Sequence, residues 1–206
     1  MPSDEQLEFG PQDCRAVAIL VHGRGGSPHD MAALARRLDQ GDVRFIMPAA
    51  PGGSWYPQRF MSPRAQNEPF LTQALDRYAN LIEGTLARGI PAERIVIGGF
   101  SQGACLTAQM LLSRPQRYGA ALVLTGGLIG EIGTAWTPEP ALAGTPVLLT
   151  SSEVDEWIPL PRVHETARFL RASGVALTMQ IFAERPHLVC AEEIALARAM
   201  LSKVAT

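Results

Sequence analysis

A serine between two glycines is the first feature of this chain whose residue types suggest chemistry. Gly99-Phe100-Ser101-Gln102-Gly103 fits the pattern Gly-x-Ser-x-Gly, in which a sharp turn exposes a nucleophilic serine hydroxyl. The strained turn leaves no room for side chains two residues away on either side, so glycine is needed at both positions. A nucleophilic serine attacks a carbonyl carbon and forms a covalent acyl intermediate. The motif therefore predicts acyl-transfer chemistry.

A serine nucleophile needs a base, and the chain has four histidines: His22, His29, His164 and His187. Only His187 follows a late predicted strand, which suits a chain order of serine, acid and then histidine. Histidine is also the side chain whose pKa best fits proton exchange near neutral pH. We therefore predict His187 as the general base for Ser101.

The acid of such a site should follow the strand that lies between the serine and the histidine. The predicted strand at 146–150 is followed by three acidic residues, Glu153, Asp155 and Glu156. A carboxylate hydrogen-bonded to the base holds its tautomer and stabilises the imidazolium that forms. We favour Asp155 in this role and keep Glu153 as the alternative.

The first predicted strand ends in a glycine-rich stretch, His22-Gly23-Arg24-Gly25-Gly26. Small residues let backbone N–H groups approach a ligand closely, as an oxyanion hole requires. A phosphate-binding loop is the alternative, but the lysine of the Walker pattern is absent from this stretch. The stretch is therefore a candidate oxyanion loop.

Six short apolar runs alternate with stretches that have the apolar spacing of helices. We predict strands at Ala16–Val21, Val43–Met47, Arg94–Ile97, Ala120–Leu124, Pro146–Thr150 and Ala176–Phe182. This alternation predicts an α/β fold, a mostly parallel sheet with helices on both faces. His22, Ser101, Asp155 and His187 each follow a predicted strand, and ligands of open α/β sheets bind beyond the carboxyl ends of the strands. We therefore expect these side chains to gather at one edge.

Each predicted helix has one apolar face for the sheet. The first also has a start signal, with Ser27 as N-cap, Pro28 at the first helical position and Asp30 closing a capping box. The other apolar sets are Leu71, Leu75, Tyr78, Ile82 and Leu86; Cys105, Leu106, Ala108, Leu111 and Leu112; Val163, Thr166, Ala167 and Leu170; and Ile194, Ala197, Leu201 and Val204.

The residues that would contact a substrate lie in loops. Pro48–Pro69 is a long connection rich in proline, glycine and aromatic residues, and loops of this length inside compact domains are usually functional or disordered. The Arg24 guanidinium is a candidate for attracting a substrate carboxylate, or it simply faces solvent. Candidates for an apolar acyl pocket, which serve equally well as packing anchors, are Trp55, Tyr56, Phe60, Met61, Trp157 and Leu188.

Composition limits the alternatives. With 206 residues, of which 47% are hydrophobic, the chain fits a single domain over residues 1–206, with residues 1–14 as an irregular extension. The net charge of −2 comes from interspersed charges, which argues against nucleic acid as a partner. The first ten residues carry Asp4, Glu5 and Glu8, and no 18-residue apolar run follows. We therefore expect a cytoplasmic protein without membrane insertion.

Three widely spaced cysteines, Cys14, Cys105 and Cys190, fit neither a zinc site nor a disulfide framework. We expect them to be buried small hydrophobic residues in a reducing compartment. No metal or organic cofactor is implied. The sequence leaves open whether the chain is a monomer or a homodimer.

Together these segments resemble the carboxylesterase/phospholipase family of α/β-hydrolases, which includes the acyl-protein thioesterases. The resemblance covers roughly residues 16–201. The segments that carry it are His22-Gly23-Arg24-Gly25, the elbow Gly99–Gly103 followed by Ala104, the acid loop Asp155–Pro159, and His187 before a helix with Glu192 and Glu193.

The resemblance implies an α/β-hydrolase fold without a separate cap domain. It maps Ser101, Asp155 and His187 onto the family's catalytic triad, and the backbone N–H groups of Arg24 and Gln102 onto its oxyanion hole. The implied activity is hydrolysis of carboxylic esters or thioesters. A ligand-binding protein of the same fold without catalysis, a lysophospholipase or acyl-protein thioesterase, and a lactone hydrolase or peptidase remain the alternatives.

Within the family, the chain is most similar to a bacterial branch with the segments Ser-Trp-Tyr-Pro, here Ser54–Pro57, and Asn-Glu-Pro, here Asn67–Pro69. This similarity favours small esters over lipidated proteins as substrates. Two positions depart from the family pattern. Arg24 stands where thioesterases usually have leucine, and Arg185-Pro186 precede His187 where glycine is common.

Overall fold

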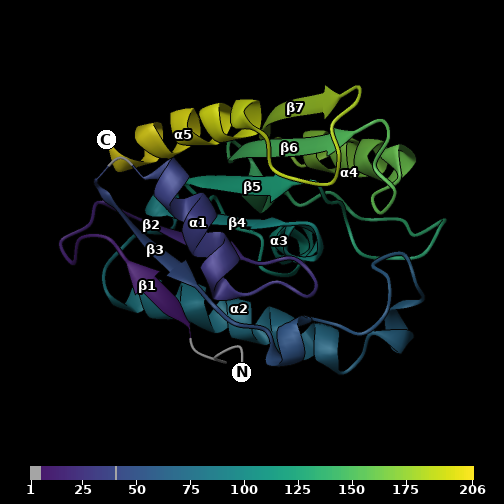
Figure 1. The fold of residues 1–206 in the computed structure, drawn as a ribbon, viewed down its shortest axis with the longest axis horizontal. Coiled ribbons are helices and arrows are strands. Elements are labelled where there is room, and N and C mark those ends of the chain that lie inside the picture. Colours follow the sequence, from purple (N-terminus) through teal and green to yellow (C-terminus); the bar gives the residue numbers. More distant parts are fainter. Residues whose placement is uncertain (1–5, 40) are drawn as a thin grey trace.

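A twisted seven-stranded sheet forms the centre of the molecule (Figure 1) in a computed structural model that describes residues 6–39 and 41–206. The spatial strand order is β1-β3-β2-β4-β5-β6-β7, and neighbouring strands are parallel except for β1, which pairs antiparallel with β3. The strands are β1 Leu7–Phe9, β2 Ala16–Val21, β3 Val43–Met47, β4 Ile95–Phe100, β5 Ala120–Leu124, β6 Pro146–Ser152 and β7 Ala176–Phe182. The predicted α/β fold is therefore confirmed.

Helices cover both faces of the sheet (Figure 1). They are α1 Pro28–Leu38, α2 Phe70–Ala87, α3 Gln102–Ser113, α4 Leu160–Ala172 and α5 Ala191–Ala205. The apolar stripes of α1 and α5 share one buried cluster with one face of the sheet, and those of α2, α3 and α4 share another with the opposite face. Strands β2, β4 and β5 are buried on both faces, as expected of a parallel sheet between two helix layers.

The largest difference from the sequence prediction lies at the amino-terminal end. Residues 1–14 were predicted to be irregular, and this was wrong for Leu7–Phe9, which pair with Phe45–Met47 as an edge strand; residues 1–5 of that extension lie outside the described residues. Three residues are too few for an alternating pattern to stand out. A smaller correction concerns β4, which begins at Ile95 because Arg94 ends a short 3₁₀ turn.

Buried aromatic side chains anchor the long connection between β3 and α2. Trp55, Tyr56 and Phe60 are buried, and two short 3₁₀ turns, Pro51–Gly53 and Arg64–Gln66, shape its backbone. The buried side chain of Asn67 crosses the segment. It accepts a hydrogen bond from the Gln58 N–H at 2.7 Å and donates one to the Arg59 carbonyl at 3.1 Å. This loop is therefore an ordered wall beside the sheet edge.

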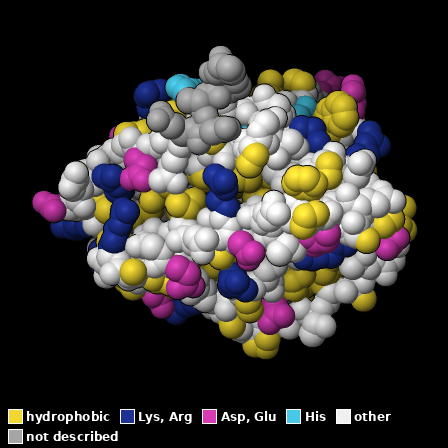
Figure 2. All heavy atoms as spheres, turned by 90° about the horizontal axis from the view of Figure 1, so that it is seen from below, with side chains coloured by type: hydrophobic (Ala, Val, Ile, Leu, Met, Phe, Trp, Pro, Cys, Tyr) yellow, Lys and Arg dark blue, Asp and Glu magenta, His cyan; other side chains and the backbone are white. Residues whose placement is uncertain are grey.

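Of the three cysteines, all free thiols, only Cys105 is fully buried, whereas Cys14 and Cys190 are half-buried. The prediction that all three are buried was therefore wrong for two of them. On the face drawn in Figure 2, basic and acidic side chains are interspersed among the described residues. Within residues 6–39 and 41–206, none of the helices combines the length and the apolar character that crossing a membrane requires.

Candidate active site

Ser101 occupies a strained turn between β4 and α3. Its φ is 55° and its ψ is −117°, a region that residues with a side chain rarely adopt. The flanking glycines explain how the turn closes. A Cβ on Gly99 would lie 2.5 Å from the carbonyl carbon of Gly103, and a Cβ on Gly103 would lie 2.1 Å from the Val21 oxygen. The predicted need for glycine at both positions is thus visible in the packing.

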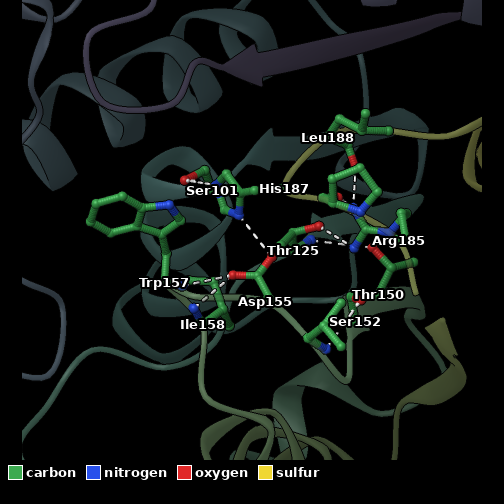
Figure 3. Close-up of polar contacts among 12 residues, drawn as sticks. Ser101, Thr125, Thr150, Ser152, Asp155, Trp157, Ile158, Arg185, His187 and Leu188 are labelled. Carbon is green, nitrogen blue, oxygen red and sulfur yellow. Dashed lines mark hydrogen bonds and ion pairs between the residues drawn. The ribbon is translucent and has the colours of Figure 1, made fainter. Parts of the chain in front are cut away.

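Three predicted side chains form one hydrogen-bonded chain (Figure 3). His187 Nε2 lies 2.8 Å from Ser101 Oγ, and His187 Nδ1 lies 2.8 Å from Asp155 Oδ2. A carboxylate only accepts, so Nδ1 carries the proton and Nε2 is left to accept from the hydroxyl. In this order the imidazole is placed to take the proton of Ser101.

Asp155 is held more rigidly than a surface aspartate. Its side chain is 0% exposed, and its Oδ1 accepts hydrogen bonds from the N–H groups of Trp157 and Ile158, both at 2.9 Å (Figure 3). One carboxylate oxygen therefore binds the following turn while the other binds His187. The backbone N–H groups of Trp157 and Ile158 thus hold the Asp155 carboxylate in place, and the carboxylate orients the His187 ring.

The other acids and histidines lie elsewhere. Glu153 and Glu156 flank Asp155 but are exposed, and His29 and His164 are exposed on α1 and α4. Among these three acidic residues, the one that contacts His187 is Asp155.

His22 follows β2 but has a structural environment. It is 1% exposed, its Nε2 accepts the Ala50 N–H at 3.0 Å, and its Nδ1 lies 2.7 Å from the Gly23 carbonyl. Its ring lies 5.0 Å from that of Trp55. Burial lowers the pKa of His22, and Nε2 as an acceptor agrees with a neutral ring. His22 therefore links the sheet edge to the long loop.

The glycine-rich loop after β2 lies directly beside Ser101. A Cβ on Gly23 would lie 3.3 Å from the Ser101 Cβ. Within the described part of the chain, the backbone N–H groups of Arg24 and Gln102 have no backbone acceptor. Two such amides beside a serine hydroxyl are available to stabilise an oxyanion.

The side chain of Arg24 fastens this loop to the long loop. Its Nη2 donates to the carbonyl oxygens of Tyr56 at 2.9 Å and Gln58 at 2.6 Å, and its Nη1 donates to that of Pro57 at 2.9 Å. A charged donor with three carbonyl partners forms a strong cross-link. Arg24 therefore has a structural task that the sequence did not indicate.

The side chain of Gln102 fastens the elbow to the same loop. Its Oε1 accepts the Trp55 N–H at 3.0 Å, and its Nε2 donates to the Tyr56 carbonyl at 2.8 Å. The two residues whose amides lie beside Ser101 thus both use their side chains to hold one segment. The long loop is fixed relative to the nucleophile.

A cavity of about 520 Å³ opens in front of Ser101. Of the predicted substrate-binding residues, Tyr56, Phe60 and Trp157 line it, whereas Trp55, Met61 and Leu188 do not. Trp55 is a packing anchor that donates from Nε1 to the His22 carbonyl at 2.8 Å. The full lining is Arg24, Tyr56, Pro57, Gln58, Arg59, Phe60, Ser101, Gln102, Cys105, Trp157, Ile158 and His187.

Cys105 lies in the cavity wall, where burial raises the pKa of its thiol to about 12. Such a thiol stays protonated and is a poor nucleophile. Ser101 therefore remains the candidate nucleophile in this cavity.

A buried arginine supports the loop that carries His187 (Figure 3). Arg185 donates to the Thr125 hydroxyl at 2.8 Å and to the carbonyl of Leu188, the residue that follows His187 in the sequence. Its Nε lies 3.7 Å from Oε2 of Glu193, which is 0% exposed. The sequence showed that Arg185 departs from the family pattern, but nothing in the sequence indicated which residues it contacts.

Comparison with known proteins agrees with this geometry. The sequence model of the phospholipase/carboxylesterase family matches residues 4–205. Acyl-protein thioesterase 1 of Gibberella zeae is 27% identical, over 91% of this chain and 90% of its own length. Acyl-protein thioesterase 1 of Eremothecium gossypii is 31% identical, over 72% and 69%.

Solved structures extend the likeness to three dimensions. A phospholipase/carboxylesterase from Dyadobacter fermentans superposes with a TM-score of 0.90 at 33% identity and covers 97% of both chains. The chain therefore belongs to the phospholipase/carboxylesterase family of α/β ester hydrolases.

Proposed function

We propose that this protein is a serine carboxylesterase that cleaves small carboxylic esters or thioesters through Ser101, His187 and Asp155. The observation that carries the proposal is the hydrogen-bonded chain from Asp155 to Ser101, with both links at 2.8 Å, facing a cavity of about 520 Å³. Family membership supports ester chemistry. The relatives named acyl-protein thioesterase 1 keep thioesters among the candidate substrates.

The proposed reaction has two halves. His187 removes the Ser101 proton, Oγ attacks the carbonyl carbon, and the backbone N–H groups of Arg24 and Gln102 stabilise the oxyanion. The alcohol or thiol leaves with the proton from His187, which gives an acyl-enzyme. Water, deprotonated by His187, then releases the carboxylic acid and restores Ser101.

We further propose that the protein works in the cytoplasm as a monomer or a homodimer. Small-molecule esters, and not nucleic acid or membrane, are the proposed partners.

The test compares the wild type with Ser101→Ala on p-nitrophenyl esters and thioesters of graded acyl length, together with a fluorophosphonate probe. We expect only the wild type to turn over and to be labelled, because the probe reacts with an activated serine. A folded wild type that does neither would instead be a ligand-binding protein of this fold.

A further inference from the structure

The cavity in front of Ser101 has cationic and apolar walls. Arg24 and Arg59 both line it, and among the described residues no aspartate or glutamate does. The apolar walls come from Phe60, Trp157 and Ile158. The lining formed by the described residues thus carries two cations and no anion, while the Asp155 carboxylate lies behind His187. A lining with a net positive charge attracts negative ligands.

The two arginines differ in what already binds them. The Arg24 guanidinium donates to three backbone carbonyl oxygens. The Arg59 side chain is exposed, and its guanidinium carbon lies 5.8 Å from the centre of the Trp157 ring. None of the ion pairs in residues 6–39 and 41–206 involves Arg59. Its donors therefore remain available at the cavity.

Arg59 is also well positioned for a binding role. Its carbonyl accepts hydrogen bonds from the buried Asn67 side chain at 3.1 Å and from the Ser62 N–H at 3.0 Å. The Trp157 backbone is fixed as well, because its N–H donates to Asp155. A cation over an indole ring keeps a preferred orientation. The guanidinium thus extends from a fixed backbone toward the Trp157 ring in the cavity wall.

We propose that the substrate of this site is an ester that carries an anionic group, a carboxylate or a phosphate, and that Arg59 binds this group. The inference rests on the proposed function, because it requires the ester carbonyl to lie at Ser101. A guanidinium matches the oxygens of carboxylate and phosphate with two parallel hydrogen bonds. The apolar walls then hold the carbon chain between the ester and the anion.

Two matched substrate pairs test the proposal. The first is the p-nitrophenyl monoester of adipic acid against the same ester with its free carboxylate methylated. The second is monobutyrylglycerol phosphate against monobutyrylglycerol. In at least one pair we expect the anionic member to have a kcat/KM about tenfold higher, the scale of a hydrogen bond to a charged group. The pair that shows the preference identifies carboxylate or phosphate as the group bound.

Variants assign the preference to Arg59. Arg59→Gln should bring the ratio of anionic to neutral kcat/KM close to one, and Arg59→Lys should keep part of it, because the charge remains without the planar fork. Arg64→Gln is the matched control. Arg64 lies in the same loop but pairs with Glu68 at 3.0 Å and does not line the cavity, so its loss should leave the ratio unchanged. Raising the salt concentration should reduce the wild-type ratio.

Equal kcat/KM within both pairs, or a preference that survives Arg59→Gln, would overturn the inference. Failure of the proposed function gives a different result. In that case the wild type neither hydrolyses the neutral esters nor reacts with the fluorophosphonate probe, and the inference fails with it.

Discussion

Single residues at this site are fixed by backbone groups. Asp155 accepts two backbone N–H groups on one oxygen and contacts His187 with the other. Ser101 has a positive φ because β4 meets α3 at two glycines. Proton transfer and nucleophilic attack both depend on geometry at this scale. Substitutions of these residues should therefore separate chemistry from folding.

Asp155→Asn should reduce kcat by about 10⁴-fold, the drop known for the same change in the trypsin-type triad. The amide of asparagine can donate to Nδ1, which would favour the tautomer that cannot accept the Ser101 proton. Steady-state kinetics on a p-nitrophenyl ester measure the change. Glu153→Gln is the control. It should keep full activity because Glu153 is exposed, and a large loss in that variant would reverse the assignment of the acid.

Gly103→Ala should destabilise the protein by several kcal/mol or prevent folding, because the new Cβ would lie 2.1 Å from the Val21 oxygen. Gly84→Ala is the comparison. Gly84 lies in α2, and a Cβ added there would meet only open space. Alanine at this position should therefore raise the free energy of unfolding by about 0.5–1 kcal/mol. Urea unfolding of both variants gives the free energies. Equal stabilities would mean that the strand-to-helix crossing is looser than the structure shows.

At the scale of elements, polar contacts join the strand ends at this site to one long loop and to α5. Arg24 and Gln102 fasten the loop to β2 and β4. Arg185 and Glu193 join the His187 loop to α5, and Glu193 also accepts the Thr150 hydroxyl of β6 at 2.5 Å. The loops that carry the chemistry are thus tied to rigid elements.

Arg185→Met should cost about 3–5 kcal/mol of stability, because the Glu193 carboxylate would be left buried without its cation. The double variant Arg185→Met/Glu193→Gln should recover part of this loss, since it removes both charges. Chemical unfolding of the wild type, both single variants and the double variant completes the thermodynamic cycle. Losses that simply add would show that the two side chains are not coupled.

The elements themselves were largely readable from the sequence, but the contacts between them were not. Apolar runs and the Ser27–Asp30 capping box mark most strands and the start of α1, and Asp30 accepts the Ser27 N–H as expected. Arg24 donates to carbonyl groups 32 to 34 residues away. Every residue has a carbonyl, so no residue type marks such partners in the sequence. The short strand β1 was missed for want of length.

At the scale of the whole molecule, the sequence indicated which candidate site residues lie together better than it indicated which residues line the cavity. Strand order brings Ser101, Asp155 and His187 to one sheet edge, so their positions after strands were informative. Trp55 and Tyr56 are both aromatic loop residues, yet only Tyr56 lines the cavity. That difference depends on how the loop folds back onto α3 and the sheet. The local sequence pattern does not encode this folding.

Global stability should depend on pH through His22. Burial lowers the pKa of His22 in the folded state below its ordinary value of 6.5. Well above pH 6.5 the ring is almost entirely neutral in both states, so it adds little pH dependence. As the pH falls below that value, the unfolded chain takes up a proton that the folded protein excludes. The free energy of unfolding should therefore decrease, by at most about 1.4 kcal/mol per pH unit for this group.

Urea unfolding at several pH values between about 7.5 and 5, for the wild type and for His22→Gln, isolates this contribution. The variant should lose less stability than the wild type as the pH falls, because glutamine does not titrate. The other titrating groups are common to both proteins. Parallel pH profiles would show that His22 takes up its proton equally in the folded and the unfolded protein.

The order of the site residues along the chain also has a consequence for synthesis. Ser101 precedes His187 by 86 residues, so a ribosome working at about 5–20 residues per second makes the serine roughly 4–17 s before its base. During that interval the elbow can form between β4 and α3 but has no group to activate it. Under the proposed mechanism, a newly made chain therefore cannot attack esters until His187, which follows the last strand, has emerged and docked against Ser101.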